Sequence, residues 1–494
     1  MKFSHFSACS LFLLVALASA GMPVSGSQEA LVQIRNDLEY IFSDPSFSAA
    51  HWGVAVQSTQ TGEYFYLRNE NKAFMPASNM KLFTTAAALL GLGNDYRFVT
   101  RLVAHGLITP DGTLQGDLII RGCGDPSLSG RWENDKITAV FERWADSLQA
   151  RKITTVTGKV IGDGRYFNDG RIGTGWAWDD LTDYYSAQIS ALTFNDNCID
   201  IVFNPGDSLG APARYTLYPN TAYVQIVNRV KTDQRSRLSF WRDPGSNKII
   251  CDGTIGLKSR DRRDWITVEN PAKYAATVFR EILLSRGIRV IEEAFEIEDL
   301  PGYLPVEYKT VQLASHTSPP LSEIVREINK ESNNLFAELM LRTVGRELEQ
   351  DGSAAGGEKA AKGLFEPAGI TPEMFYAADG SGLSRQDLVS PMSVIRLLRF
   401  MREQTVGQAY FDSLPVAGVD GTLKGRMRGT AAKGNVHAKT GFIGRVRALS
   451  GYVTTRDNEV LVFSMIVNNY NVPTGTANHL QDLVCERLAN FSRK

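Results

Sequence analysis

Residues 76–93 read PASNMKLFTTAAALLGLG and predict a helix with a defined start and end. Pro76 suits a first helical turn, alanine and leucine fill the body, and Gly91 and Gly93 fit a C-terminal stop. Apolar side chains extend almost all the way round this helix. We therefore expect it to lie buried at the centre of a domain.

Ser78 and Lys81 are the chemically informative pair within this helix. They are three residues apart, so on a helix they share one face, with the lysine one turn beyond the hydroxyl. An unpaired buried ammonium is costly, or its pKa falls until the group is neutral. A desolvated lysine beside a serine is a nucleophile with its base. The alternative is a lysine that extends from a helix end so that its charge stays in water.

The overall composition is typical of a globular protein without a strong electrostatic preference. The chain has 494 residues, which favours about three domains, and a formal net charge of −1. We therefore expect no nucleic-acid partner and no attraction to an anionic membrane. Six histidines without an HExxH pattern argue against a zinc hydrolase, and no metal or cofactor is implied.

Residues 1–20 have the pattern of a secretory signal peptide. Lys2 and His5 precede an apolar run that ends in an A-x-A-like site at Ala18-Ser-Ala20. No later stretch approaches the roughly 20 apolar residues of a membrane span, so no transmembrane span is expected. We predict cleavage after Ala20 and export to the periplasm, free or peripheral to the membrane. An uncleaved N-terminal anchor is the alternative.

Four cysteines lie beyond the predicted signal peptide: Cys123, Cys198, Cys251 and Cys485. In an oxidising compartment they allow three pairings, among which the sequence does not choose. We predict a Cys198–Cys251 disulfide, because both residues lie in strand-like stretches of one central region. The alternative is that all four are buried thiols.

The order of helical and strand-like segments predicts an α+β fold. The strands expected near the two ends of the chain lie at residues 51–56, 63–67, 435–441, 446–454 and 460–467. Together they could form a single antiparallel sheet. Short strands and turns dominate the middle of the chain. We therefore expect a discontinuous domain, 21–95 with 301–494, interrupted by a β-rich region, 96–300, of two nested domains.

Ser332-Asn-Asn334 lies at a break between two helical segments within residues 321–346. Polar residues crowd this break in a way that is unusual for a surface turn. The alternative interpretation is a helix-capping pair.

Lys439-Thr440-Gly441 lies on a predicted strand whose period of two places His437, Lys439 and Gly441 on one face. The lysine and threonine could instead be solvated residues of an edge strand. His437 could be the base in an alternative mechanism in which a serine is activated by a histidine. Its shared face with Lys439 instead favours a side chain that packs in the active-site cleft and takes no part in the chemistry.

Three motifs of this chain resemble those of the penicillin-recognising serine enzymes, and each lies on the type of element that it needs. They are Ser78-x-x-Lys81, Ser332-x-Asn334 and Lys439-Thr-Gly441. The long stretch between the first two motifs is similar to the insertion of the class C low-molecular-mass penicillin-binding proteins, the D-alanyl-D-alanine carboxypeptidase/endopeptidases. Further matching strings lie at residues 124–126, 176–178, 379–385 and 414–423. The resemblance covers essentially the whole mature chain. It implies a transpeptidase-like domain, with about five antiparallel strands flanked by helices, and a large β-rich insertion.

The resemblance also implies the catalytic roles. Ser78 would be the acylated nucleophile and Lys81 its general base. Ser332 would relay a proton to the leaving D-alanine, and Asn334 would hold the substrate amide and the Lys81 side chain. Lys439 would supply a like charge that lowers the pKa of Lys81, which the chemistry requires even without the resemblance.

Substrate contacts follow from the same resemblance. Thr440 and Lys439 would bind the terminal carboxylate, and the backbone N–H groups of Ser78 and Phe442, just past Gly441, would form the oxyanion hole. The side chain of the stem peptide would contact three residues: Asp180, Tyr185 and Arg385. Asn333, where many relatives carry Asp, is expected to point away from the cleft.

We therefore expect a serine DD-peptidase that cleaves D-Ala-D-Ala termini or D-Ala-DAP cross-links of peptidoglycan and is acylated by β-lactams. Its partners would be peptidoglycan stem peptides and β-lactam antibiotics, with a homodimer possible. A β-lactamase or esterase on the same fold is one alternative, which the long insertion disfavours. A catalytically idle wall-binding protein is another, which the intact Ser78, Lys81 and Lys439 disfavour.

Overall fold

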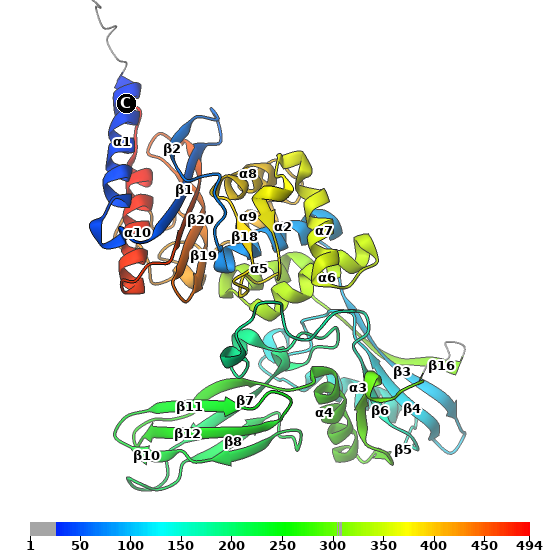
Figure 1. Ribbon diagram of the computed structural model, residues 1–494. Coiled ribbons are helices and arrows are strands. Elements are labelled where there is room, and N and C mark those ends of the chain that lie inside the picture. The colour runs from blue at the N-terminus through cyan, green and yellow to red at the C-terminus, as the bar shows by residue number, and fades with distance from the viewer. Residues whose placement is uncertain (1–25, 304, 306–308) are drawn as a thin grey trace, which may run out of the picture.

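The computed structural model describes residues 26–303, 305 and 309–494. The predicted signal peptide, residues 1–20, lies outside this range. Figure 1 shows a sheet at the upper left, a cluster of helices beside it, and the inserted strands in the lower half. Within the described residues, no helix combines the length and apolarity needed to cross a membrane.

The predicted antiparallel sheet is formed by the two ends of the chain. In spatial order its strands are β19 (His437–Ile443), β20 (Val446–Thr454), β21 (Val460–Asn468), β1 (His51–Ser58) and β2 (Tyr64–Arg68). All four pairings are antiparallel. Helices α1 (Gly26–Phe42) and α10 (Thr474–Asn490) share a hydrophobic core with this sheet on the left of Figure 1. The expected five-stranded sheet with flanking helices is confirmed.

The expected buried helix is also confirmed, although its first turn is tighter than an α-helix. A 3₁₀ turn, η2 (Ala77–Asn79), leads into α2 (Met80–Leu92), and every side chain from Met80 to Leu89 is buried. Gly93 ends the helix with a φ of 87°. The helical cluster around α2 contains α5 (Leu321–Glu331), α6 (Asn334–Glu349), α7 (Ala354–Phe365), α8 (Pro391–Arg402) and α9 (Gly407–Ser413).

Between α2 and α5 the described chain forms a seven-stranded sheet and two smaller sheets. The large sheet contains β3 (Val99–Ile108), β4 (Thr113–Arg121), β5 (Thr155–Val156), β6 (Val160–Asp163), β14 (Arg289–Val290), β15 (Ala294–Glu296) and β16 (Thr310–Thr317), with α3 (Ala139–Ala150) and α4 (Pro271–Ser285) against it. The smaller sheets contain β7 (Cys198–Asn204), β8 (Arg214–Tyr218) and β13 (Arg262–Thr267), and β9 (Gln225–Asn228), β10 (Lys231–Asp233), β11 (Arg237–Arg242) and β12 (Lys248–Gly256). Strand β16 lies beyond residue 300 and still pairs with β3. The division into domains stays a prediction.

The Cys198–Cys251 disulfide predicted from the sequence is wrong. Cys123, Cys198, Cys251 and Cys485 are all free thiols. Cys198 begins β7 and packs in the core around α2, whereas Cys251 lies in β12 and packs in the core of the inserted strands. The two strands also belong to different sheets. Burial raises the pKa of the Cys251 thiol to about 12.

Candidate active site

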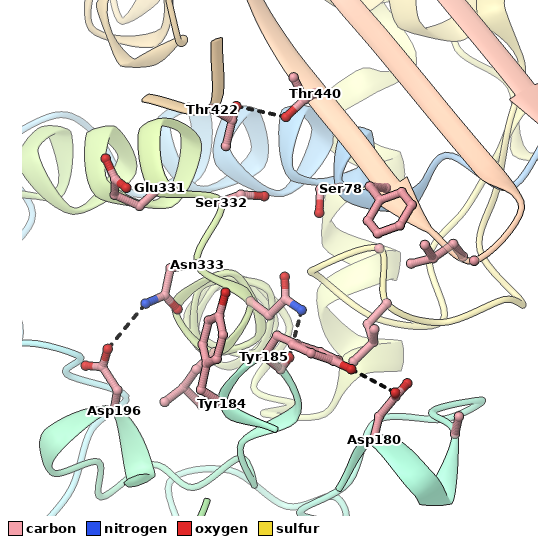
Figure 2. A pocket seen from close by; sticks show the side chains of 18 of the residues that line it. Ser78, Asp180, Tyr184, Tyr185, Asp196, Glu331, Ser332, Asn333, Thr422 and Thr440 are labelled. Atoms are coloured by element: carbon pink, nitrogen blue, oxygen red, sulfur yellow. Dashed lines mark hydrogen bonds between the residues drawn. The ribbon is translucent and has the colours of Figure 1, made fainter. Parts of the chain in front are cut away.

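The three sequence motifs meet at one cavity of about 740 Å³. Ser78 comes from η2, Ser332 and Asn334 from the break between α5 and α6, and Thr440 from β19. Figure 2 shows Ser78, Ser332 and Thr440 across the cavity from Tyr184, Tyr185 and Asp180 of the inserted region. Lys81 and Lys439 are fully buried beside these residues.

Ser78 is held against β19 by its neighbour Asn79. The Asn79 Nδ2 donates a hydrogen bond to the Lys439 carbonyl at 2.7 Å, and the Ser450 hydroxyl donates to Asn79 Oδ1 at 3.0 Å. Gly441 permits this close approach, because a Cβ there would lie 2.6 Å from the Pro76 carbonyl oxygen. The start of the helix and the strand are therefore fixed relative to each other by buried polar contacts.

Lys81 has the geometry of a general base for Ser78. Its Nζ donates hydrogen bonds to Asn334 Oδ1 and to the Ser381 carbonyl, both at 2.6 Å, and lies 3.1 Å from Ser78 Oγ. A neutral amine has two N–H donors and one lone pair. The two short contacts occupy the donors and leave the lone pair for the serine hydroxyl proton. Burial lowers the pKa of Lys81 from its usual value to about 8.

The lowered pKa of Lys81 does not require the charge of Lys439 that we expected to cause it, and that role of Lys439 stays a prediction. Burial is the cause of the shift, and the carboxylates of Asp379, Glu338 and Asp387 act in the opposite direction. Burial first, and the charge of Lys81 second, hold the pKa of Lys439 well below its usual value. The repulsion between the two ammonium groups is mutual, so it disfavours protonation of both lysines together.

Glu338 is a residue that the sequence interpretation missed. It lies on α6 and is fully buried, and its Oε1 accepts hydrogen bonds from the backbone N–H groups of Gly380 and Ser381. Its Oε2 accepts a hydrogen bond from Arg342 at 2.8 Å. Glu338 thereby fixes the loop whose Ser381 carbonyl contacts Lys81. The available signal was a single acidic residue within the apolar run 335–341.

Ser332 and Thr440 are the hydrogen-bond partners of the Lys439 side chain. The Lys439 Nζ donates to Ser332 Oγ at 2.8 Å and to the Thr440 carbonyl at 3.1 Å. Thr440 Oγ1 donates to Thr422 Oγ1 at 2.8 Å, as the dashed line in Figure 2 shows. Thr422 lines the cavity and was not singled out from the sequence, although it lies within the string 414–423.

Asn333 does not point away from the cleft as expected. It is among the residues that line the cavity, and Figure 2 shows its side chain directed toward Asp196. Its Oδ1 accepts a hydrogen bond from the backbone N–H of Phe336, so it caps α6. Because the helix begins immediately after this residue, the cap sets the direction of its side chain.

The residues expected to contact the stem-peptide side chain, Asp180, Tyr185 and Arg385, all line the same cavity. The Tyr185 hydroxyl lies 2.9 Å from Asp180 Oδ1, and its backbone carbonyl accepts a hydrogen bond from Asn334 Nδ2 at 2.7 Å. Arg385 donates to the Gly444 carbonyl at 3.0 Å. Phe442 lines the cavity and is half exposed.

His437 takes no part in this arrangement. Its ring stacks on Phe411 with 4.3 Å between the ring centroids, and it is not among the residues that line the cavity. It is therefore a packing residue of β19, and the alternative mechanism with a histidine base has no geometric support. In the described part of the chain, no group of three or more His, Cys, Asp or Glu side chains is placed to hold a metal ion.

Comparison with known proteins agrees with this geometry. The family model of the D-Ala-D-Ala carboxypeptidase 3 (S13) family matches residues 34–489. The chain belongs to the S13 family. A D-alanyl-D-alanine carboxypeptidase of Actinomadura sp. (strain R39) is 35% identical, with 98% of this chain and 89% of that protein covered. A D-alanyl-D-alanine carboxypeptidase DacB of Haemophilus influenzae is 28% identical, with 82% of each chain covered.

The fold of this S13 member is also similar to that of a solved structure. The crystal structure of penicillin binding protein 4 (dacB) from Haemophilus influenzae superimposes with a TM-score of 0.80 at 23% identity, covering 92% of this chain and all of that one. The resemblance seen in the sequence, the α+β fold class and the predicted serine DD-peptidase class are thus confirmed.

Proposed function

We propose that Ser78 attacks the carbonyl carbon of the penultimate D-alanine while Lys81 accepts the serine proton. The observation that carries this proposal is the set of three contacts made by Lys81 Nζ. Attack forms the bond from Ser78 Oγ to carbon, and the following collapse breaks the bond to the terminal D-alanine nitrogen. Water then hydrolyses the ester, and its proton returns through Lys81.

Ser332 and Lys439 would deliver the proton that the leaving amine needs. The 2.8 Å contact between Lys439 Nζ and Ser332 Oγ supports this role. Through it, Lys439 would pass to the Ser332 hydroxyl the proton that Lys81 took from Ser78, which replaces the proton given to the amine and leaves Lys81 neutral for the hydrolysis step. Asn334 would keep Lys81 in place through its Oδ1 and hold the substrate amide. One of the two N–H bonds of its Nδ2 already reaches the Tyr185 carbonyl, which leaves the other for substrate.

The backbone N–H groups of Ser78 and Phe442 would form the oxyanion hole. The close approach of Gly441 to Pro76 supports this role, because it brings the two backbone segments together at the nucleophile. Each such donor is worth about 3 to 4 kcal/mol in the transition state. Thr440 and Lys439 would bind the terminal carboxylate.

Asp180, Tyr185 and Arg385 would select the stem-peptide side chain. Their carboxylate, phenol and guanidinium groups face one cavity, so a side chain that carries both an amine and a carboxylate, as in a D-Ala-DAP cross-link, finds complementary charges there. We further propose that β-lactams acylate Ser78. The Haemophilus influenzae relative has been solved in complex with a β-lactam. The periplasmic location, the cleaved signal peptide and the homodimer stay predictions.

Release of D-alanine from a synthetic stem peptide tests this function. The protein should release D-alanine from a peptide ending in D-Ala-D-Ala, cleave a cross-linked dimer, or do both, and Ser78→Ala should do neither. The same assay compares the carboxypeptidase with the endopeptidase activity. Equal activity of the Ser78→Ala variant would show that another residue is the nucleophile.

A further inference from the structure

Exposed aromatic side chains border the active-site cavity on the side of the inserted strands. We define the aromatic rim as Trp178, Tyr184, Tyr185, Trp241 and Trp265. Trp178, Tyr184 and Trp265 are 68%, 62% and 49% exposed. The other tryptophans of the described chain, outside the rim, are all buried or partly buried. Contiguous exposed apolar surface marks a binding site more often than scattered single residues do.

Three rings of the rim follow one another along the wall of the cavity. Tyr185, whose carbonyl contacts Asn334, has its ring 5.7 Å from that of Tyr184, which lies 6.3 Å from Trp265. Figure 2 shows Tyr184 and Tyr185 at the cavity wall. A second pair, Trp178 and Trp241, has ring centroids 6.1 Å apart. This pair is connected to the three other rings through η4 (Trp178–Asp180), because Asp180 contacts the Tyr185 hydroxyl.

The rim is fixed from beneath by a buried arginine. The Arg242 guanidinium donates to the Leu181 carbonyl and to Thr267 Oγ1, both at 3.1 Å, and forms an ion pair with Glu269 at 3.0 Å. These contacts tie the segment that carries Trp178 and Tyr184 to β11 and β13, which carry Trp241 and Trp265. The segments that carry the rings are therefore tied to one another before a ligand arrives, which lowers the entropy cost of binding.

We propose that the aromatic rim binds sugar rings of the glycan strand to which the stem peptide is attached. This proposal rests on the proposed function, because a peptide held in the cavity must continue out of it toward its glycan. The apolar C–H face of a pyranose ring matches the flat face of an indole or phenol ring. Exposed carboxylates next to the rings in sequence can accept hydrogen bonds from sugar hydroxyl and amide groups: Asp179, Asp183 and Asp243.

An anionic lipid surface fits the rim less well. Asp179, Asp183 and Asp243 would be repelled by negatively charged headgroups. The rim also begins at the wall of the catalytic cavity rather than at a remote end of the inserted region. Both observations favour a ligand that is continuous with the substrate.

A double variant, Trp178→Ala with Trp241→Ala, tests the proposal, because neither side chain lines the cavity. Hydrolysis is compared between a free stem peptide and the same peptide attached to its amino-sugar disaccharide. We expect kcat/KM to stay unchanged on the free peptide and to fall about tenfold on the glycan-linked peptide. The matched control is Tyr40→Ala, an 85% exposed aromatic residue on α1, which should change neither rate. No change, or equal losses on both substrates, would overturn the proposal.

Direct binding separates this proposal from the proposed function. Calorimetry with a β-1,4-linked N-acetylglucosamine tetramer should show binding to the unmodified protein and at least tenfold weaker binding to the double variant. Co-sedimentation with anionic phospholipid vesicles should show no binding by either. Absent or unaltered sugar binding, or vesicle binding that depends on the two tryptophans, would overturn the glycan site. If the unmodified protein fails to hydrolyse the free peptide, the proposed function is wrong, and the sugar titration still decides the glycan site.

Discussion

The Nζ of Lys81 lies 2.6 Å from Oδ1 of Asn334, although the two residues are 253 positions apart in the chain. The contact joins α2 to the break between α5 and α6. It restrains the lysine side chain and leaves the Nζ within 3.1 Å of Ser78 Oγ. The large insertion between the two residues folds back so that its Tyr185 carbonyl contacts the same asparagine.

Asn334→Ala should lower the rate of acylation by about a hundredfold, because Lys81 loses the acceptor that orients it toward Ser78. The second-order rate constant for reaction with benzylpenicillin measures this effect. The matched control is Asn333→Ala, which removes the cap of α6. That variant should lose about 1 kcal/mol of stability in a denaturant titration and keep a near-normal acylation rate. A reversed pattern would contradict the assignment.

The acylation rate should rise with pH through about 8 and then level off, because the general base must be neutral and burial lowers the pKa of Lys81 to about 8. Below that pH the rate should fall about tenfold per unit. The negative charge of Glu338 raises the pKa of Lys81, so Glu338→Gln should move the midpoint to lower pH. A midpoint that moves upward, or a flat profile between pH 6 and 10, would argue against Lys81 as the base.

Gly382→Ala should disrupt the site, because Gly382 has a φ of +82° and a Cβ there would lie 1.8 Å from the Ala77 carbonyl oxygen. The loop must then move away from Ser78, and both acylation and thermal stability should fall. Gly363→Ala is the comparison, since Gly363 is exposed within α7 and an added Cβ meets nothing within 4 Å. It should raise stability by about 0.5 to 1 kcal/mol without changing activity. Comparable effects of both variants would contradict the close-packing argument.

All four cysteines beyond the predicted signal peptide should react with a thiol reagent once the protein is unfolded without reductant. Cys198, Cys251 and Cys485 should be protected in the folded protein, because they are buried. A reducing agent should leave the melting temperature unchanged. Any thiol that becomes reactive only after reduction would reveal a disulfide.

The local patterns of the sequence predicted the elements that carry the site. Three local patterns each specify an element and the face on which its side chains lie: the apolar run around Lys81, the polar break at Ser332 and the alternation around Lys439. The type of element and the face depend mainly on near neighbours in sequence. The sequence also indicated that the strands near the two chain ends could form one sheet.

Features that depend on distant contacts could not be predicted in the same way. The role of Glu338 depends on a loop more than forty residues later in the chain, as its contacts with Gly380 and Ser381 show. The pKa of Lys81 reflects burial among several elements, and the separation of Cys198 from Cys251 depends on which sheet each strand joins. Asn333 was misjudged because its capping of α6 decides the direction of its side chain.

The most direct test of the mechanism is the intact mass of the protein without residues 1–20 after mixing with benzylpenicillin, beside a Ser78→Ala variant. We predict a stable one-to-one adduct that is absent from the variant. Rapid turnover of penicillin without an adduct would indicate a β-lactamase instead. No adduct and no turnover, or an adduct that persists in the Ser78→Ala variant, would contradict the assignment of Ser78 as the nucleophile activated by Lys81.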